Sequence, residues 1–372
     1  MFTSKQLIHV RDVIHRRRNE SGLRPWARGV AGALAILLGT ASAAILAGEP
    51  PGSSEKPDFT NLSLEELLKA EITPIDVLGS HTHLAREIMF GYRYSYQRYE
   101  GNLEGSREVS AAGVLAKYDL YHPWMDMHMQ MFEAMYAPSD RWTLMGMTHY
   151  MDMHMGHLRR NGTTFVSASE GIGDTEVMGL YNLLGDPRGK GHRLILDGGI
   201  SLPTGSINKK FAGKQLEYSM QLGSGTLDVL PGLTYLGSSD RWSWAVQAGG
   251  TIHTGQNDRG YRLGDRYQLG AWGHYKLTEW LGPSLRLDWK QWGNISGADA
   301  ALDPMHNPAF DATLQEGRRL DLLAGLHFYA HRGPLKGLRF STEGGMSVYQ
   351  HLAGPNLKSD WMINLSLNYV LR

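Results

Sequence analysis

The sequence contains no cysteine, although its N-terminal residues have the composition of an export signal. An exported protein of this kind builds its fold without disulfides. Neither charge is in excess, with 37 Lys and Arg against 37 Asp and Glu, so a nucleic-acid partner is not expected. Beyond the N-terminus there is no run of about eighteen apolar residues, which excludes a helical membrane protein for the rest of the chain.

Signatures of common enzyme classes are missing too. The sequence has no GxSxG, HExxH or paired-cysteine motif, so it provides neither an activated serine nor a thiolate site. Ser, His and Asp occur, but no spacing assembles them into a triad. We therefore expect a protein that is not an enzyme and that requires no cofactor.

The N-terminus carries a predicted secretory signal. A basic segment, RRRNESGLRPWAR, precedes the apolar segment GVAGALAILLGTASAAILA, and Ala41-Ser42-Ala43 is a small-residue cleavage site. We expect residues 1–43 to be a signal peptide, with an uncleaved membrane anchor as the alternative. Residues 44–85 are expected to be a periplasmic tail, in which a Pro, Gly and Ser-rich linker precedes a short amphipathic helix in NLSLEELLKAEIT.

Hydrophobicity alternates with a period of two from residue 88 to the end of the chain. In SLRLDWK, Leu285, Leu287 and Trp289 share one face, and Arg286 and Asp288 lie on the other. The segments HRLILDGGISL, RWSWAVQAGGTIH and WMINLSLNYVLR repeat this pattern. It is typical of a transmembrane β-barrel, whose strands are apolar toward lipid and polar toward the lumen. A secreted all-β sandwich or propeller is the alternative, because its strands alternate as well.

The lengths of the connections favour the barrel. Alternate connections are short, such as APSD, GDPRGK and LGSSD, whereas the others are longer, up to GNISGADAALDPMHNPAFDATLQEG. Outer-membrane barrels have short periplasmic turns and long external loops. We therefore predict an all-β fold, a transmembrane antiparallel up-and-down β-barrel of about 12 strands over residues 86–372. The candidate strands lie near 86–98, 125–137, 141–157, 173–184, 191–202, 224–236, 241–253, 265–277, 282–293, 318–331, 335–349 and 360–371.

A methionine-rich hairpin is the most unusual part of the chain. Residues 125–155, MDMHMQMFEAMYAPSDRWTLMGMTHYMDMHM, hold ten of the 17 methionines, and all ten have odd numbers. Side chains two residues apart in a strand share a face, so the methionines form one stripe. A turn at APSD centres the hairpin near residue 140. It predicts the pairs Met125 with Met155, Met127 with Met153, Met129 with Met151, Met131 with His149, Glu133 with Met147, and Met135 with Met145.

The stripe is predicted to face the lumen, because the even face carries Phe132, Trp142 and Leu144, which suit lipid. Thioether sulfur is a soft ligand for Cu(I) or Ag(I), and imidazole is a compatible partner. Weak, repeated sites are what conduction needs. Two alternatives remain open: an apolar path for solutes, and packing against the tail folded into the lumen. The candidate metal ligands are Met125, Met127, Met129, Met131, Glu133, Met135, Met145, Met147, His149, Met151, Met153 and Met155.

Several segments carry a family resemblance: MHMQMFEAMYAPSDRWTLMGMTHYM, GIGDTEVMGLYNL, LPTGSI, MQLGSGTLDVLPGLTY and GYRLGD. Over nearly all of residues 60–372 the chain resembles the bacterial outer-membrane transporter family named after the meta-pathway of phenol degradation, in a methionine-rich branch. The resemblance implies a Gram-negative outer-membrane barrel with a channel-like role and suggests aromatic solutes. The methionine-rich branch invites comparison with outer-membrane copper-resistance proteins.

The main functional hypothesis is an outer-membrane channel or transporter that handles Cu(I) or Ag(I) as the bound or transported ion. The alternative is a porin-like channel for hydrophobic or aromatic small molecules, with the methionines as apolar lining. An outer-membrane enzyme of the lipase type has no nucleophile signature in this chain. The expected partners are outer-membrane lipid and lipopolysaccharide, a small solute or metal ion, and a periplasmic partner at the N-terminal tail.

Overall fold

The computed structural model describes residues 81–187, 191–330 and 333–371. The chain divides into two compact units, Met1–Leu62 and Ser63–Arg372, and all described residues lie in the second. The predicted signal peptide, the linker and the short tail helix lie outside the described residues.

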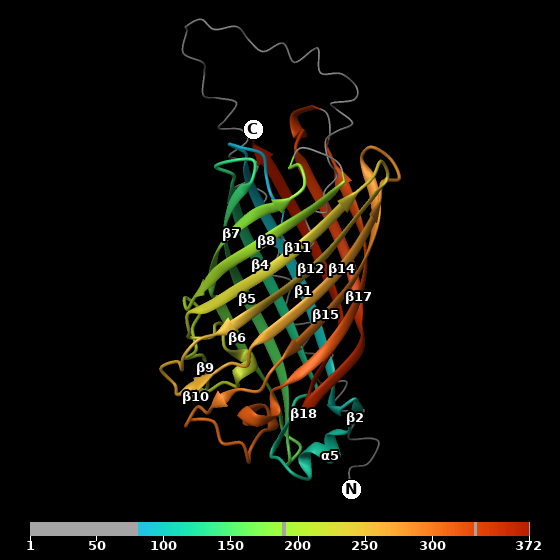
Figure 1. Cartoon of the computed structure of the whole chain (residues 1–372). Coiled ribbons are helices and arrows are strands. Elements are labelled where there is room, and N and C mark those ends of the chain that lie inside the picture. The colour runs from blue at the N-terminus through green and yellow to red at the C-terminus, as the bar shows by residue number, and fades with distance from the viewer. Residues whose placement is uncertain (1–80, 188–190, 331–332, 372) are drawn as a thin grey trace, which may run out of the picture. The chain divides into compact units, whose positions relative to one another are not determined.

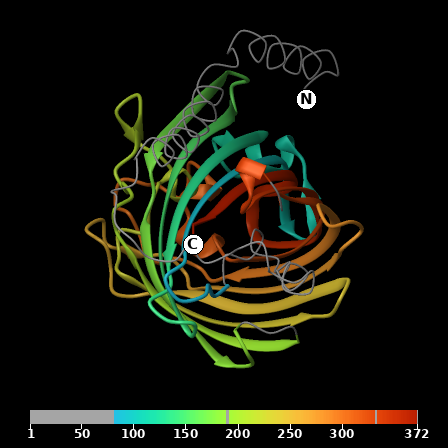
Figure 2. The ribbon, with the colours of Figure 1, turned by 90° about the horizontal axis from the view of Figure 1, so that it is seen from above.

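Eleven strands form one closed antiparallel ring (Figures 1 and 2). Each strand pairs with the next one in the ring, and β18 pairs back with β1. Closure leaves no strand edge with free backbone groups, which a barrel in lipid requires. The strands are β1 (Ile88–Gly105), β4 (Trp124–Tyr136), β5 (Trp142–Arg159), β7 (Thr175–Leu184), β8 (His192–Leu202), β11 (Asp228–Ser238), β12 (Trp242–His253), β14 (Arg266–Tyr275), β15 (Leu281–Trp292), β17 (Gly317–Tyr329) and β18 (Leu338–Leu371).

The long strand β18 contributes two crossings of the barrel. Its first part, up to Leu352, pairs with β17, and its last part pairs with β1. The two parts contact each other, because Gln350 Nε2 donates to the Ser359 carbonyl (2.7 Å) and Ser359 N donates to Gln350 Oε1 (2.8 Å). A closed ring of antiparallel neighbours needs an even number of crossings, and the two parts of β18 bring the ring to twelve. The predicted antiparallel β-barrel of about 12 strands is confirmed.

The two faces of the strands differ as the alternation predicts. In β15, Leu285 and Leu287 are exposed on the outer face, whereas Arg286 and Asp288 are buried on the inner face. An apolar outside around a polar inside is the pattern of a barrel that lies in lipid. Among the described residues, no helix combines the length and the apolar character needed to span a bilayer.

Short and long connections alternate around the ring, as predicted, so the barrel has a turn end and a loop end. The loop end carries small elements that the sequence did not predict, because their length of two to nine residues gives little periodicity. They are β2 (Arg107–Val109), α5 (Ala111–Leu115), β3 (Leu120–Tyr121), β6 (Thr164–Ile172), β9 (Lys210–Phe211), β10 (Lys214–Gln215), η2 (Tyr218–Met220), β13 (Tyr261–Arg262), β16 (Ser296–Gly297), η3 (Pro308–Phe310) and η4 (Ala312–Leu314). A further turn, η5 (Gly333–Leu335), lies at the turn end.

The residues directly before β1 lie on the inner side of the turn end. His83 N donates to Oγ1 of the inward-facing Thr143 at 3.0 Å, and Arg86 N donates to the Ala137 carbonyl at 2.7 Å. His81 and His83 are both buried. This segment therefore packs against the inner face of the barrel at the turn end.

The lipid-facing role of the outer side chains is testable with a pair of arginine substitutions. Leu287 is 43% exposed in the middle of β15, and Leu277 is 59% exposed in the turn after β14. We expect Leu287→Arg to lower the free energy of unfolding by about 2–4 kcal/mol, because its guanidinium enters hydrocarbon. Leu277→Arg should change it by less than about 1 kcal/mol. Denaturant unfolding in phospholipid vesicles measures both, and equal effects contradict the assignment of the outer face to lipid.

Candidate functional site

The methionine hairpin pairs in the predicted register on the inner face of the barrel. Met135, Met153 and Met155 are fully buried, whereas Phe132 and Leu144 are exposed on the outer face. Methionine faces methionine in four of the pairs. The observed pairs are Met125 with Met155, Met127 with Met153, Met129 with Met151, Met131 with His149, Glu133 with Met147, and Met135 with Met145.

At the turn end, the stripe is part of an apolar cluster. Met135 and Met145 pack there with Met89 of β1, and inward side chains of the next strands complete the group. Methionine is flexible enough to fill the space between branched side chains of this kind. The turn-end methionine cluster consists of Met89, Met135, Met145, Leu180, Ile195, Leu236 and Ala245, with Met178 and Val370 packed against it.

At the loop end, the stripe packs against a loop that folds inward. The connection 203–227 between β8 and β11 places three apolar side chains against the stripe. The predicted metal ligands in this part are therefore in apolar contact with this loop. The predicted tail, which the packing alternative invoked, lies outside the described residues. The loop-end methionine cluster consists of Met125, Met151, Met153, Met155, Leu216, Met220 and Leu222, with Tyr99, Met127, Met129 and Leu357 packed against it.

Asp174 anchors this inward loop at both of its ends. Its carboxylate accepts hydrogen bonds from Gly205 N at 2.8 Å and from Ser224 N at 2.7 Å. A Cβ at Gly223 would lie 2.4 Å from Asp174 Oδ1, so this approach requires glycine. Charge-assisted bonds to backbone N–H groups are among the stronger hydrogen bonds, and here they hold the loop inside the barrel.

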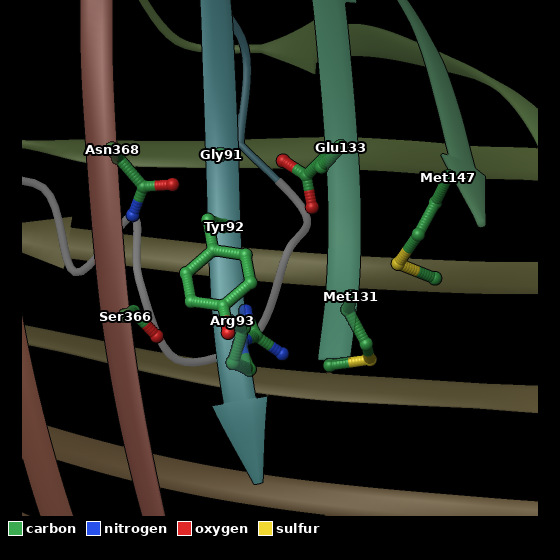
Figure 3. Close-up of a pocket in the computed structure, with 8 residues that line it drawn as sticks. All are labelled: Gly91, Tyr92, Arg93, Met131, Glu133, Met147, Ser366 and Asn368. Carbon is green, nitrogen blue, oxygen red and sulfur yellow. The ribbon is translucent and has the colours of Figure 1, made fainter. Parts of the chain in front are cut away.

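Between the two clusters lies a pocket of mixed chemistry (Figure 3). Met131, Met147 and the Glu133 carboxylate line one side, and Arg93 and Asn368 line the other. The period-two alternation of β1 and β18 places both Arg93 and Asn368 on the inner, polar strand face. The pocket offers an apolar thioether surface beside groups that bind a polar substituent.

Gly91 and Gly173 each lie too close to an inner-face side chain for a larger residue to fit. A Cβ on Gly91 would lie 2.6 Å from Asn368 Oδ1, so a larger residue at this position would displace the amide. The predicted ligand His149 lies over Gly173, where a Cβ would be 1.9 Å from its Nε2. Met131 and His149 are paired in register, but His149 is not among the residues that line the pocket.

The wall across the lumen from the methionine hairpin is charged. β15 and β17 lie on the far side of the ring from β4 and β5, and their inward side chains form an ion-pair network with the first part of β18. Paired charges of both signs keep water at this wall without a large net field. The shortest pairs are Arg286 with Glu343 (2.9 Å), Lys290 with Asp288 (2.8 Å) and Arg319 with Asp321 (3.1 Å).

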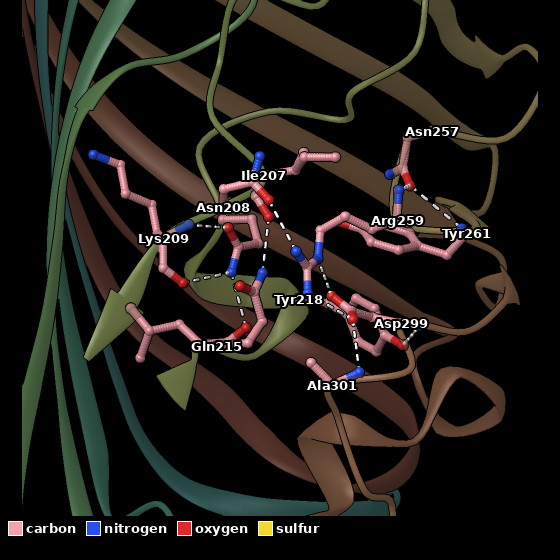
Figure 4. Close-up of polar contacts among 12 residues, drawn as sticks. Ile207, Asn208, Lys209, Gln215, Tyr218, Asn257, Arg259, Tyr261, Asp299 and Ala301 are labelled. Carbon is pink, nitrogen blue, oxygen red and sulfur yellow. Dashed lines mark hydrogen bonds and ion pairs between the residues drawn. The ribbon is translucent and has the colours of Figure 1, made fainter. Parts of the chain in front are cut away.

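Three long connections are tied together at the loop end (Figure 4). Arg259 Nη2 donates to Asp299 Oδ1 at 2.8 Å, its Nε pairs with the other carboxylate oxygen, and its Nη1 donates to Asn208 Oδ1 at 2.9 Å. The Tyr218 hydroxyl accepts from Asp299 N at 3.0 Å. The connections joined in this way are 203–227, 254–265 and 293–316, and together they form the loop-end cap.

The comparisons with known proteins agree with this fold. A family model described as "Putative MetA-pathway of phenol degradation" matches residues 128–342. The search of curated proteins gave no match. Among solved structures, the COG4313 outer membrane channel from Pseudomonas putida F1 is similar, with 13% identity, 81% of this chain and 100% of that chain covered, and a TM-score of 0.57. This similarity confirms the outer-membrane barrel fold.

Two other structures match with lower TM-scores. The KdgM porin has 9% identity, with 76% of this chain and 99% of that chain covered and a TM-score of 0.39. A Pseudomonas aeruginosa FadL homologue has 9% identity, with 76% and 90% covered and a TM-score of 0.39.

Hydrogen exchange of backbone amides tests the Arg259–Asp299 ion pair that links the connections of the loop-end cap. Arg259→Gln leaves the Asp299 carboxylate, which is 3% exposed, without its cation. Removing one partner of a buried ion pair costs up to about 3–5 kcal/mol, and less here because the guanidinium is partly exposed. We expect the amides of residues 293–303 to exchange at least about tenfold faster by mass spectrometry.

Lys117→Gln is the matched control for this change. Lys117 pairs with Glu104 at 4.0 Å, and both side chains are exposed, so exchange in residues 293–303 should not change. If Arg259→Gln leaves the exchange rates at their original values, the loops are held together by other contacts.

Proposed function

The chain belongs to the family described as "Putative MetA-pathway of phenol degradation", and we propose that it is an outer-membrane channel for small hydrophobic or aromatic molecules. The fold it shares with a structure named as an outer membrane channel supports this class of function. On this proposal the turn end faces the periplasm and the loop end faces outward. Residues 1–43 direct export, residues 44–85 meet a periplasmic partner, and lipid and lipopolysaccharide surround the barrel.

The observation that carries the proposal is the apolar side of the lumen. A barrel lumen is normally polar, yet here thioether and aliphatic side chains follow one wall from the loop-end to the turn-end methionine cluster. Between the clusters, Met131 and Met147 line the pocket of mixed chemistry (Figure 3). Met127, Met129, Met131 and Met147 are only partly buried. Sulfur–aromatic contacts contribute about 0.3–1.5 kcal/mol each, so an aromatic solute is bound weakly at each of these methionines and not tightly at one site.

The polar side of the lumen complements this wall. Arg93, Glu133 and Asn368 lie beside the thioethers in the pocket, and the ion-pair network of β15 and β17 faces them across the ring. A solute with an aromatic ring and a hydroxyl group can place its ring on the methionines and its hydroxyl toward these polar groups. The lining therefore favours small amphipathic aromatics over sugars, which have no apolar face of that size.

Replacing the sulfur by carbon, or by an amide of similar size, tests this proposal. We expect the double variant Met131→Leu, Met147→Leu to keep the uptake of a radiolabelled aromatic hydrocarbon within about twofold, since it preserves the apolar surface. The matched variant Met131→Gln, Met147→Gln should lower uptake about fivefold or more, because the solute must displace water bound to the amides. Gram-negative cells that lack their own hydrophobic-solute channels provide the assay.

The two double variants also separate the apolar role from a role of sulfur itself. Equal loss of uptake in the leucine and glutamine variants contradicts the proposal. Barrel assembly is checked in both variants by the mobility of unheated protein on gels, so that a folding defect is not read as a transport defect.

A second candidate function rests on the register of the hairpin. Four methionine pairs, Met125 with Met155, Met127 with Met153, Met129 with Met151 and Met135 with Met145, provide two sulfurs at each of four levels of the barrel wall. Pairs of thioethers suit Cu(I) or Ag(I). On this candidate the stripe passes or holds a soft metal ion, and the apolar packing around it excludes water from the path.

A silver titration tests this second candidate. If the stripe binds metal, replacing Met129, Met131, Met151 and Met153 by leucine should weaken Ag(I) binding to the purified barrel about tenfold or more, since leucine offers no ligand atom. Isothermal titration in detergent measures the affinity and the number of bound ions. Unchanged silver binding in the quadruple variant excludes the stripe as a metal path and leaves its apolar role.

A further inference from the structure

Three polar side chains from distant parts of the chain converge at the loop end. His122 lies between β3 and β4, His157 lies on β5, and Glu217 precedes η2 in the inward loop. Each offers one ligand atom, and these atoms all lie within 4.8 Å of one another. His122 Nε2 is 3.9 Å from Glu217 Oε1. The three residues adjoin the loop-end methionine cluster but do not belong to it.

Of the imidazole nitrogens, His122 Nε2 is held by a side-chain amide that a bound cation would replace, and His157 Nδ1 has no partner among the described residues. Asn307 Oδ1 accepts from Ala309 N at 3.0 Å, which orients the amide so that Asn307 Nδ2 donates to His122 Nε2 at 3.2 Å. His122 Nε2 is thus an acceptor. His157 Nε2 lies 2.7 Å from the Ser167 hydroxyl, and its Nδ1 has no hydrogen-bond partner among the described residues. Second-shell contacts of this kind orient histidines that bind metals.

One oxygen of the Glu217 carboxylate also lacks a donor among the described residues. Glu217 Oε1 makes no hydrogen bond to any described residue, although the side chain is only 2% exposed. Glu217 Oε1 and His157 Nδ1 therefore have no hydrogen-bond partner among the described residues, whereas His122 Nε2 accepts from the Asn307 amide. Such an arrangement is unfavourable unless a cation or a proton lies between the groups.

Burial shifts the charge states of this group toward neutrality. It raises the pKa of Glu217 to about 7 and lowers the pKa of His122 well below its usual value. A neutral imidazole has the free lone pair that metal binding needs, and a bound cation stabilises the ionised carboxylate. The ring of His157 is held in place by Phe165, which stacks on it at 4.3 Å.

We propose that His122, His157 and Glu217 form a binding site for a divalent transition-metal ion of the Zn²⁺ class. Two imidazole nitrogens and one carboxylate oxygen are a known donor set for Zn²⁺, with a fourth position open to water. Tetrahedral ligands at about 2.1 Å from the ion are about 3.4 Å apart, so small side-chain rotations close the site. Imidazole and carboxylate favour this borderline ion over Cu(I), which distinguishes the site from the methionine stripe.

A bound ion would join three parts of the structure that the chain leaves separate. Its ligands come from the connection 106–123, from the barrel wall and from the inward connection 203–227. The ion would fix the inward loop against β5 and stabilise the loop-end cap in its present position. This role does not depend on which solute the lumen accepts.

Zinc titration of the purified full-length barrel, after treatment with a chelator, tests the site. We expect the wild type to bind one equivalent of Zn²⁺, and Glu217→Gln and His157→Gln each to weaken that binding about tenfold or more. Glutamine replaces a carboxyl of the same size, so Glu217→Gln is expected to fold. Hydrogen exchange in residues 214–222 should slow on addition of zinc in the wild type and stay unchanged in Glu217→Gln.

His306→Gln is the matched control, because His306 is an exposed histidine beside Asp119 and Asp303 at the same end of the barrel. The His306→Gln variant should still bind one equivalent of Zn²⁺. The proposal is overturned if the wild type binds no zinc, if Glu217→Gln binds zinc as the wild type does, or if His306→Gln abolishes the binding. The Met131→Leu, Met147→Leu variant should still bind zinc, so failure of this site is separable from failure of the proposed channel.

Discussion

Closure of the ring between β1 and β18 is the constraint on which the rest of the structure depends. Residues from Ile88 to Gly105 pair with the last part of β18, so every strand has two neighbours. In hydrocarbon, a strand edge with free N–H and C=O groups costs several kcal/mol per group. Closure removes that cost, and it gives each strand one face toward lipid and one toward the lumen. The alternation of apolar and polar side chains along the strands follows from this division.

Within that frame, the inner face is divided between two kinds of surface. The hairpin of β4 and β5 presents thioethers, and β15 and β17 present paired charges on the far side of the ring. Loop residues extend the apolar wall: Leu216, Met220 and Leu222 pack against its loop end. The loop that Asp174 holds in place therefore shapes the lumen as much as the strands do.

The same inward loop connects the lumen to the cap. Tyr218 accepts a hydrogen bond from Asp299, and Glu217, its neighbour in sequence, faces His122 and His157. One short segment thus contacts the methionine stripe, the ion-paired cap and the proposed metal site.

The sequence by itself determined the strands, their faces and the register of the methionine hairpin. Period-two alternation and the turn at APSD are local signals, so Met129 opposite Met151 and the outward Leu287 were predictable from residue numbers. Only the tertiary structure decided that the connection 203–227 folds inward, and that His122, His157 and Glu217 meet. Those contacts join residues far apart in sequence through irregular backbone, where no periodicity relates one position to another.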